Sequence, residues 1–413
     1  MNRRPLRILL LNQYFPPDAS ATARVTRDAV SALREAGHEV TVIAGRPSYD
    51  PTERQTWRLL RRSRAEGVTV ERVGSFAFSR ARMAGRVANY VSYLALALWR
   101  GLTQRADLVL AMTDPPVVSV VGALVASLRR VPFVYNVRDL HPEMAVAAGL
   151  ARRGLAVGVW ERLHRWSLRR ADRVIVLGED MRRRVLEKGV SPERVSVIRD
   201  GAPVPTRLPA RDDPVCREIT SGFSFVILHA GNLGFAGAWE TILEAARSVD
   251  GGAGFVFVGD GAAAGAVRAQ AAALPNVRFL PYRPAEEVPH VLQAGDLHLV
   301  TVRRGLDGLV VPSKLYPILA AGRPVLAVAP EGSDAAEIVR RTECGWVAAP
   351  DDPAAVVRAL YEAMSDRGEL ERRGRRAREA AREFERSREL QRMVRTLEAS
   401  ARCPSYDRVA RGG

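Results

Sequence analysis

The chain has 413 residues, enough for two domains of ordinary size, and its 47% hydrophobic and 26% charged residues exclude a disordered protein. Its net charge of +16 fits an anionic substrate or membrane surface better than nucleic acid, because the sequence shows no zinc-ligand spacing, helix-turn-helix pattern or aromatic strand platform. The three cysteines are scattered, which argues against a disulfide framework. The apolar run at the N-terminus is too short for a signal peptide, and no stretch of about 18 apolar residues predicts a transmembrane helix. A reducing compartment, the cytoplasm, is therefore expected.

The first half alternates predicted strands with predicted helices, which is typical of an α/β domain with a parallel sheet. Strands are expected over Leu6–Leu11, Val40–Ala44, Leu108–Met112, Phe133–Val137 and Arg173–Leu177, and helices over Val25–Ala36, Val117–Leu128 and Leu155–Arg170. Ser48–Arg64 is basic and is expected to be irregular. In such domains the loops at the carboxyl ends of the strands carry the functional side chains.

The segment Arg80–Arg105 combines an apolar stretch, including Tyr90, Tyr93 and Trp99, with flanking arginines. A helix of this kind can lie on an anionic membrane, with its aromatic and leucine side chains immersed and its arginines at the head groups. A core helix with an arginine rim is the more frequent outcome of the same pattern, and we favour it. Peripheral contact with an anionic membrane stays open as the alternative.

The loop after the predicted strand Phe133–Val137 carries Arg138, Asp139, His141 and Glu143. An arginine, two carboxylates and an imidazole at one strand end form the best catalytic constellation of the first half. The alternative is an internal salt bridge, from Arg138 to Asp139 or Glu143, that only fixes the loop. We place the catalytic interpretation slightly ahead.

The second half repeats the α/β pattern after a proline-rich stretch. Strands are expected over Phe223–His229, Phe255–Val258, Val277–Leu280, Leu297–Val302 and Val325–Ala329, and helices over Ala285–Gln293 and Glu369–Leu397. The expected organisation is a first domain over residues 1–200, a linker over 201–220, a second domain over 221–380, and, over 381–413, a helix that crosses back to the first domain and a loose tail.

Two glycine-rich turns follow the first two predicted strands of the second half, with Gly231, Asn232 and Gly234 in one and Gly259 and Gly261 in the other. Glycines at these places let backbone N–H groups approach a diphosphate. The second turn differs in spacing from a dinucleotide fingerprint and lacks a suitably placed acidic residue, so NAD binding is rejected. Turns that serve only close packing are the alternative.

The strand Leu297–Val302 is followed by a cationic loop that includes Arg303, and then by Ser313, Lys314 and Leu315. Ser313 is predicted to cap a helix whose N–H groups and positive dipole end suit a phosphate, although spacing alone gives this only an even chance. Lys314 is one of two lysines among 62 basic residues, and its compact ammonium at a helix start favours a specific role.

The string Pro312-Ser313-Lys314-Leu315, with Ala320-Ala321-Gly322 and Pro324-Val325, resembles the nucleotide-binding core of family 4 glycosyltransferases, particularly bacterial surface polysaccharide and antigen enzymes. Arg138, Asp139, Pro142 and Glu143 are similar to a second motif of that family, and the resemblance runs from Leu6 to about Arg386. It implies a GT-B fold, α/β with two Rossmann-like domains facing across a cleft.

The resemblance also implies transfer of a sugar from a nucleotide-diphosphate sugar to a hydroxyl acceptor, which is lipid-linked in several members, at the inner face of the cytoplasmic membrane. No metal or other cofactor is expected. On the acceptor side it implies roles for Arg138, Asp139, His141 and Glu143. Donor-binding roles fall to Gly231, Asn232, Gly234, Gly259, Gly261, Tyr282, Arg303, Ser313, Lys314 and Leu315.

Three positions depart from the family pattern. Leu309 and Pro317 stand where the family has acidic residues, one of which holds the donor ribose, and Phe235 stands where it has a basic residue. A second hypothesis is therefore a catalytically degenerate scaffold that binds a sugar nucleotide or a partner without turnover. Measured turnover of sugar nucleotides would separate the two hypotheses.

Overall fold

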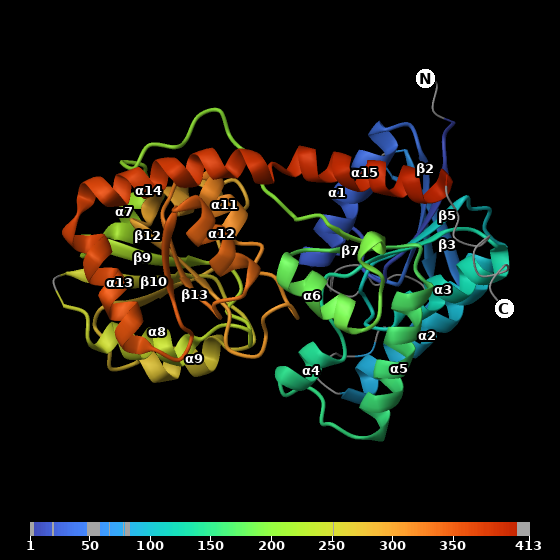
Figure 1. Cartoon of the computed structure of the whole chain (residues 1–413), viewed down its shortest axis with the longest axis horizontal. Helices are drawn as coiled ribbons and strands as arrows, with labels where there is room; N and C mark the ends of the chain where they lie inside the picture. Colours follow the sequence, from blue (N-terminus) through green and yellow to red (C-terminus); the bar gives the residue numbers. More distant parts are fainter. Residues whose placement is uncertain are drawn as a thin grey trace. The chain divides into compact units, whose positions relative to one another are not determined.

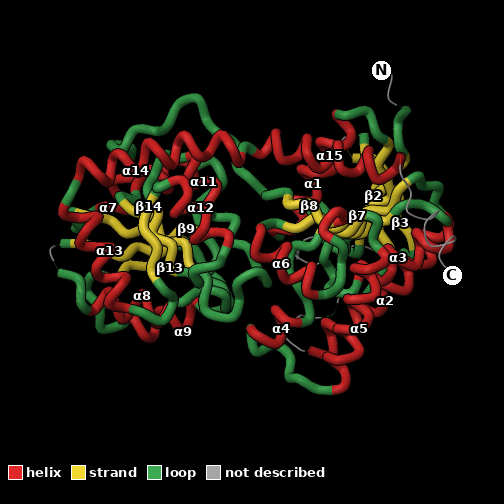
Figure 2. Tube along the Cα trace, viewed as in Figure 1, coloured by secondary structure: helices red, strands yellow, loops and turns green. Residues whose placement is uncertain are grey.

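The structure is a computed structural model that describes residues 4–402 apart from residues 19, 48–57, 66, 77, 79–82 and 251. The chain divides into two compact units, each α/β (Figures 1 and 2). The first comprises Met1–Leu177, Arg182–Ile198 and Leu390–Gly413, and the second comprises Gly178–Met181 and Arg199–Glu389. Residues 201–220, expected as a linker, belong to the second unit and contain a helix.

The first unit is built on an eight-stranded sheet with strand order β3-β4-β2-β1-β5-β6-β7-β8. Its strands are β1 (Arg7–Leu11), β2 (Glu39–Ala44), β3 (Leu60–Ala65), β4 (Val68–Val73), β5 (Leu108–Ala111), β6 (Phe133–Asn136), β7 (Arg173–Val176) and β8 (Val195–Val197). All neighbours are parallel except β3 and β4. The expectation of irregular chain up to Arg64 is wrong from Leu60 onward, because β3 is an edge strand whose exposed arginines hide its strand character.

Helices cover both faces of this sheet (Figure 1). They are α1 (Ala21–Glu35), α2 (Met83–Thr103), α3 (Val118–Arg129), α4 (Glu143–Ala147), α5 (Leu155–Arg170) and α6 (Glu179–Glu187), with the 3-10 turn η1 (Pro192–Arg194). One face packs against α1 and the end of α15 (Arg386–Arg402), from which Met393, Val394 and Leu397 enter the core. On the other side α3 packs against both α2 and α5.

The predicted Arg80–Arg105 helix is present as α2, with residues 79–82 of the segment outside the described residues. Tyr93 and Ala97 are fully buried, and the Tyr93 hydroxyl donates to the Ile43 carbonyl at 2.9 Å. Val91 and Trp99 are nevertheless exposed. The helix is thus part of the core on one side and apolar on its solvent side as well. Within the described residues, no helix combines the length and hydropathy needed to cross a bilayer.

The second unit has a six-stranded parallel sheet with strand order β11-β10-β9-β12-β13-β14. Its strands are β9 (Phe225–Ala230), β10 (Ala253–Val258), β11 (Val277–Leu280), β12 (Leu297–Thr301), β13 (Val325–Val328) and β14 (Gly345–Ala348). The order reverses between β9 and β12, so the loops that follow these two strands diverge and leave a crevice at the sheet edge. This is the strand order of a Rossmann domain.

The helices of the second unit are α7 (Pro214–Thr220), α8 (Trp239–Arg247), α9 (Ala264–Ala271), α10 (Val288–Ala294), α11 (Leu315–Ala320), α12 (Asp334–Thr342), α13 (Pro353–Ser365) and α14 (Arg367–Ala380). The single helix predicted over Glu369–Leu397 is wrong, because the 3-10 turn η2 (Ala381–Phe384) separates α14 from α15. The break is fixed by tertiary contacts: the Ala202 N–H donates to the Phe384 carbonyl, and the Phe384 ring is buried against Tyr316.

Candidate functional site

The predicted donor loops meet where the strand order of the second sheet reverses. Gly231, Asn232 and Gly234 follow β9, and Arg303 follows β12. The Arg303 N–H donates to the Ala236 carbonyl at 2.8 Å, which ties the two loops together. The residues that the sequence singled out therefore lie together where the strand order reverses, which is the place where open α/β sheets bind ligands.

Lys314 lies directly against the first of these loops. Its Nζ is 2.8 Å from Nε2 of His229 and 2.7 Å from the carbonyl oxygen of Asn232. Desolvation lowers the pKa of Lys314 to about 7, and burial together with the nearby ammonium lowers the pKa of His229 well below its usual value. His229 is therefore neutral and accepts through Nε2.

No carboxylate among the described residues forms an ion pair with Lys314. Both of its partners are neutral acceptors, so the positive charge of the protonated side chain is not compensated by the protein. A desolvated cation without a counterion is unfavourable by itself and is stabilised by a bound anion. The arrangement is suited to a phosphate or diphosphate.

The glycines of these turns allow the loops and the lysine to pack closely. Gly231 has φ +123°, and a Cβ on it would lie 2.8 Å from Cε of Lys314. Gly259 has φ +141°, and its Cβ would lie 2.2 Å from the Gly231 carbonyl oxygen, while a Cβ on Gly261 would lie 2.3 Å from Oδ1 of Asn232. Close packing therefore requires glycine at 259 and 261, and Gly231 makes room for Lys314.

The prediction that Ser313 caps the following helix is wrong. The Leu315 N–H donates to the Pro312 carbonyl, so the chain first makes a turn and α11 begins at Leu315 with Lys314 at its N-cap. Ser313 is exposed, and the Leu315 side chain is buried in the core. A helix of six residues contributes only a small dipole, so the cation at this place is the Lys314 side chain.

Tyr282 follows β11 and approaches the second glycine turn. Its hydroxyl donates to the Asp260 carbonyl at 2.9 Å, between Gly259 and Gly261, and the residue is 56% exposed. A fixed aromatic ring beside the turn offers a stacking surface for a nucleotide base. Arg304, in contrast, is paired with Asp351 and is largely compensated.

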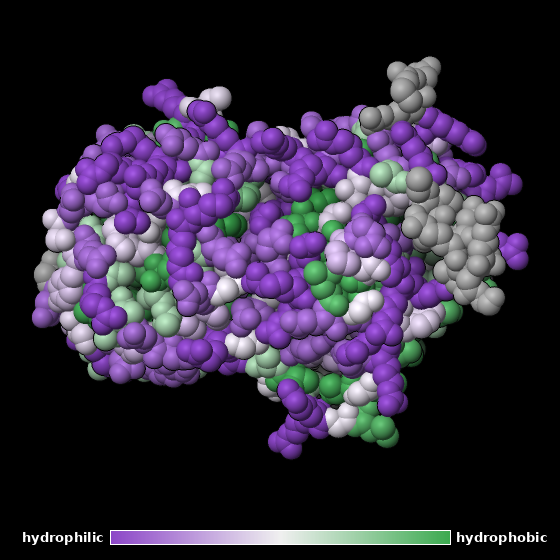
Figure 3. Space-filling view, in the orientation of Figure 1, coloured by the Kyte–Doolittle hydropathy of each residue, from purple (hydrophilic) through white to green (hydrophobic). Residues whose placement is uncertain are grey.

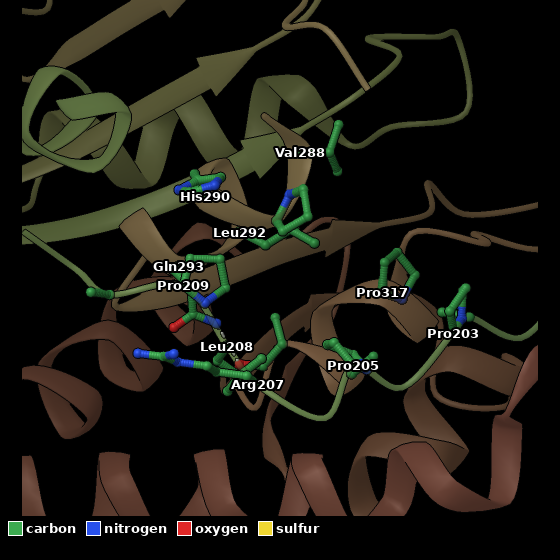
Figure 4. A pocket seen from close by; sticks show the side chains of 15 residues that line it. Pro203, Pro205, Arg207, Leu208, Pro209, Val288, His290, Leu292, Gln293 and Pro317 are labelled. Carbon is green, nitrogen blue, oxygen red and sulfur yellow. Dashed lines mark hydrogen bonds between the residues drawn. The ribbon is translucent and has the colours of Figure 1, made fainter. Parts of the chain in front are cut away.

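Pro317 lines an apolar pocket of about 730 Å³ in the second unit (Figure 4). The segment 202–210 and the helices α10 and α11 form its walls, and Leu208, Val288 and Leu292 contribute apolar side chains. None of the predicted donor residues lines this pocket. At the position where the family has a ribose-binding acid, this chain therefore presents an apolar side chain.

In the first unit the structure keeps the predicted catalytic residues in one loop, directly after β6. The backbone N–H of Arg138 donates to Oγ1 of Thr113 at 2.8 Å, and Thr113 in turn donates to the Asn136 carbonyl. Because Thr113 follows β5, the loop is anchored at the carboxyl ends of two neighbouring strands. Arg138 and Asp139 are half-buried there.

His141 is buried and stacks on Trp160, with ring centroids 5.5 Å apart. Burial lowers its pKa to about 4, so the imidazole is neutral at pH 7. Its Nδ1 and Oε2 of Glu143 are buried atoms without a hydrogen-bond partner.

Lys188, which the sequence did not assign to the site, holds Glu143. Its buried Nζ donates to Oε1 of Glu143 and to both carboxylate oxygens of Glu161, at 2.8 and 2.9 Å. Glu143, Glu161 and His164 bring possible metal-ligand atoms within 4.8 Å of one another, but the ammonium already bridges the two carboxylates. The cluster is therefore an ion-pair network. The only feature of the sequence that pointed to Lys188 was the rarity of lysine in the chain.

The chain forms two Rossmann-like α/β units, which is the GT-B class of fold. One unit carries Lys314 where its strand order reverses, and the other carries the loop with His141 and Glu143. Residues 20–201 match the family described as Glycosyl transferase 4-like domain, and residues 224–366 match Glycosyl transferases group 1. The two matches lie in tandem along the chain, and the chain belongs to these glycosyltransferases.

Two sequence relatives agree with this assignment, and a structural neighbour shares the fold. The chain is 32% identical over 269 residues to the probable glycosyltransferase WbjE of Pseudomonas aeruginosa, covering 63% of this chain and 66% of WbjE. It is 26% identical over 333 residues to WcaI of Escherichia coli, named for colanic acid biosynthesis, covering 77% and 82%. HepE of Anabaena, solved in complex with UDP, has the same fold at a TM-score of 0.70 and 17% identity, covering 95% of this chain and 100% of HepE.

Proposed function

We propose that this glycosyltransferase moves a sugar from a nucleotide-diphosphate sugar to a hydroxyl acceptor in bacterial polysaccharide biosynthesis, without a metal ion. The observation that carries the proposal is the environment of Lys314. Its ammonium is desolvated, lies where the strand order of the second sheet reverses, and has no counterion among the described residues. The name of WcaI supports the pathway, and the UDP and UDP-glucose complexes of HepE make uridine donors the first to test.

On the donor side, the diphosphate would lie against Lys314, Asn232 and Arg303. A fixed cation stabilises the negative charge that builds up on the leaving diphosphate, which is the contribution that a metal ion makes in other transferases. The glycines at 231, 234, 259 and 261 keep the backbone close to the ligand, and Tyr282 would stack on the base. Ser313, exposed beside Lys314, remains a candidate contact.

On the acceptor side, the hydroxyl would be oriented by Arg138, Asp139, His141 and Glu143. His141 is a weak base, because its pKa of about 4 lies well below neutral pH, and it is better suited to accept a hydrogen bond than to remove a proton. Glu143, whose carboxylate is held by Lys188, would accept a hydrogen bond from the acceptor hydroxyl. A lipid-linked acceptor is the form that would bring the enzyme to the inner face of the cytoplasmic membrane.

The second candidate is a scaffold that binds a sugar nucleotide without turnover. Pro317 favours it, because an apolar side chain stands where the family holds the ribose. Leu309 is buried and also offers no carboxylate, and Phe235 is partly exposed and offers no cation.

A thermal-shift screen of nucleotides and sugar nucleotides tests the proposal, with Lys314→Met and the paired, exposed Arg304→Gln as matched variants. At a ligand concentration of 100 times Kd a true donor should stabilise the protein by about 2.7 kcal/mol. We expect this shift in the wild type and in Arg304→Gln, and a clearly smaller shift in Lys314→Met at the same ligand concentration. Stabilisation by a sugar nucleotide that is neither hydrolysed nor transferred would establish the scaffold instead.

A further inference from the structure

The apolar pocket of the second unit has no part in the donor site, since none of the predicted donor residues lines it. Its volume of about 730 Å³ falls within the range of roughly 300–1,000 Å³ that is usual for small-molecule sites. Most of its walls come from leucine, valine, alanine and proline side chains. Water gains few hydrogen bonds from such walls, so an apolar ligand can displace it at little cost.

One wall of the pocket is the segment 202–210, which is fixed at both ends. The Ala202 N–H donates to the Phe384 carbonyl at 3.1 Å, and just beyond the other end Arg211 pairs with Asp296 at 2.8 Å. Figure 3 shows mostly hydrophilic residues where Figure 1 draws this segment, at the top of the second unit, and its apolar side chains line the pocket. The prolines between the two anchors restrict the backbone, which favours a preformed pocket.

The pocket is apolar at one end and polar at the other (Figure 4). Toward the apolar end lie three proline rings, those of Pro203, Pro205 and Pro317. Leu208 and Leu292 lie between the two ends. Toward the polar end lie the side chains of Arg207, His290 and Gln293. An elongated ligand with an apolar body and one polar end matches this arrangement.

Two of the three polar side chains already have partners in the protein. The Gln293 amide donates to a backbone carbonyl and accepts from Arg323, both at 2.8 Å. Nδ1 of His290 lies 3.2 Å from a carboxylate oxygen of Asp213. Arg207 is exposed and forms no ion pair within the described part of the chain, and no acidic residue lines the pocket. The polar end therefore favours a negative charge.

We infer that this pocket binds a single-chain amphipathic anion, an alkyl chain that ends in a carboxylate or a phosphate. The chain lies on the leucines and prolines, and the anionic group pairs with Arg207. A neutral ligand would leave the cation without a counterion, and a sugar would place hydroxyl groups against apolar walls without hydrogen-bond partners. The inference concerns a site other than the donor site and does not rest on the proposed function.

Isothermal titration calorimetry of the full chain with decanoate and decyl phosphate, each below its micelle concentration, tests the inference. We expect one molecule bound per chain, and about tenfold weaker binding of decanol, which lacks the charge. From dodecanoate to octanoate, affinity should fall about fourfold for each methylene removed, because the pocket buries the chain. Tighter binding of decanoate would indicate a fatty acid as the ligand, and tighter binding of decyl phosphate a lipid phosphate.

Three variants locate the binding. Arg207→Gln should weaken decanoate binding about tenfold and leave decanol binding unchanged, because only the anion pairs with the guanidinium. Arg217→Gln is the matched control, since Arg217 is an exposed arginine of α7 that does not line the pocket, and it should change neither. Val288→Asp should weaken both ligands. Val288 is exposed at the first residue of α10, where a carboxylate suits the helix dipole, so the variant should fold.

Several results would overturn the inference. Equal weakening by Arg207→Gln and Arg217→Gln would show that net charge, and not this site, attracts the anion. Wild-type affinity in Val288→Asp would place the alkyl chain elsewhere, and equal affinity for decanol and decanoate would remove the role of the cation. Sedimentation of a dimer that Val288→Asp dissociates would also overturn it, since the pocket would then hold a second copy of the chain.

Discussion

The two lysines of this chain occupy opposite electrostatic environments. Lys188, in the first unit, lies between the carboxylates of Glu143 and Glu161, so the protein itself neutralises its charge. Among the described residues, the partners of Lys314 in the second unit are His229 and a backbone carbonyl, and desolvation lowers its pKa to about 7. The first lysine is part of the folded structure, and the second is available to a ligand.

The difference shows how the same residue type serves stability in one place and binding in another. An internally paired charge stabilises the fold and contributes little to affinity for an anion. An unpaired, desolvated charge destabilises the folded protein, and a bound anion reverses that destabilisation. Variants at the two lysines should therefore have opposite effects on stability and affinity.

The largest expected effect is on stability at Lys188. Lys188→Met leaves two carboxylates without their cation, and we expect a loss of about 2–3 kcal/mol, less than for a fully buried pair because both carboxylates are partly exposed. Urea unfolding measures it. Adding Glu161→Gln should recover part of the loss, and affinity for a nucleotide sugar should not change. A loss of affinity at unchanged stability would reverse the assigned roles.

Lys314→Met should affect binding instead. Removing one charge-assisted contact costs about 1.5–3 kcal/mol, which is a loss of affinity for a nucleotide sugar of roughly 10- to 100-fold. Stability without ligand should stay the same or rise, because a desolvated ammonium without a counterion has been removed. Isothermal titration calorimetry and urea unfolding of the same preparation check both outcomes, and unchanged affinity would contradict the proposed donor site.

Affinity should also depend on pH with a defined sign. Below pH 7 Lys314 is mostly protonated and binds the diphosphate, and above pH 7 it is mostly neutral in the free protein. The bound diphosphate raises this pKa, so affinity for a nucleotide sugar should fall by up to about tenfold per pH unit above 7 and then level off. His229 stays neutral throughout this range. Titrations in the wild type and in Lys314→Met should differ, since the variant lacks the dependence.

The smallest effect is expected from restoring the family's cation beside the donor loop. Phe235 is partly exposed, and Phe235→Arg would add a screened charge worth about 0.4–1 kcal/mol, or roughly two- to fivefold in affinity. The gain should shrink as salt is raised. Phe235→Met is the neutral control, and an equal gain in both variants would assign the effect to packing.

Much of the fold was predictable because hydrophobic periodicity is a local signal. The helix Leu155–Arg170 and the strand Val277–Leu280 lie where the pattern placed them. The prediction missed β3, whose arginines face solvent at the sheet edge, and the break at Phe384, which depends on burial against Tyr316. At the site, the structure places Lys314 against the Asn232 turn, and its role there stays a prediction. The prediction of Ser313 as a cap was wrong, because the turn at Pro312 precedes the helix.

The sequence by itself determined the alternation of strands and helices, the loops that carry polar groups, and the family, because each depends on residues close together in the chain. The tertiary structure decided which charges are paired and which faces are covered. Lys188 meets Glu143 across 45 residues, and α5 exposes Leu155 and Leu163 while Ser167 and His164 find partners on other elements. Contacts between distant segments select one face of a helix and one partner of a charge, and local periodicity contains no information about either.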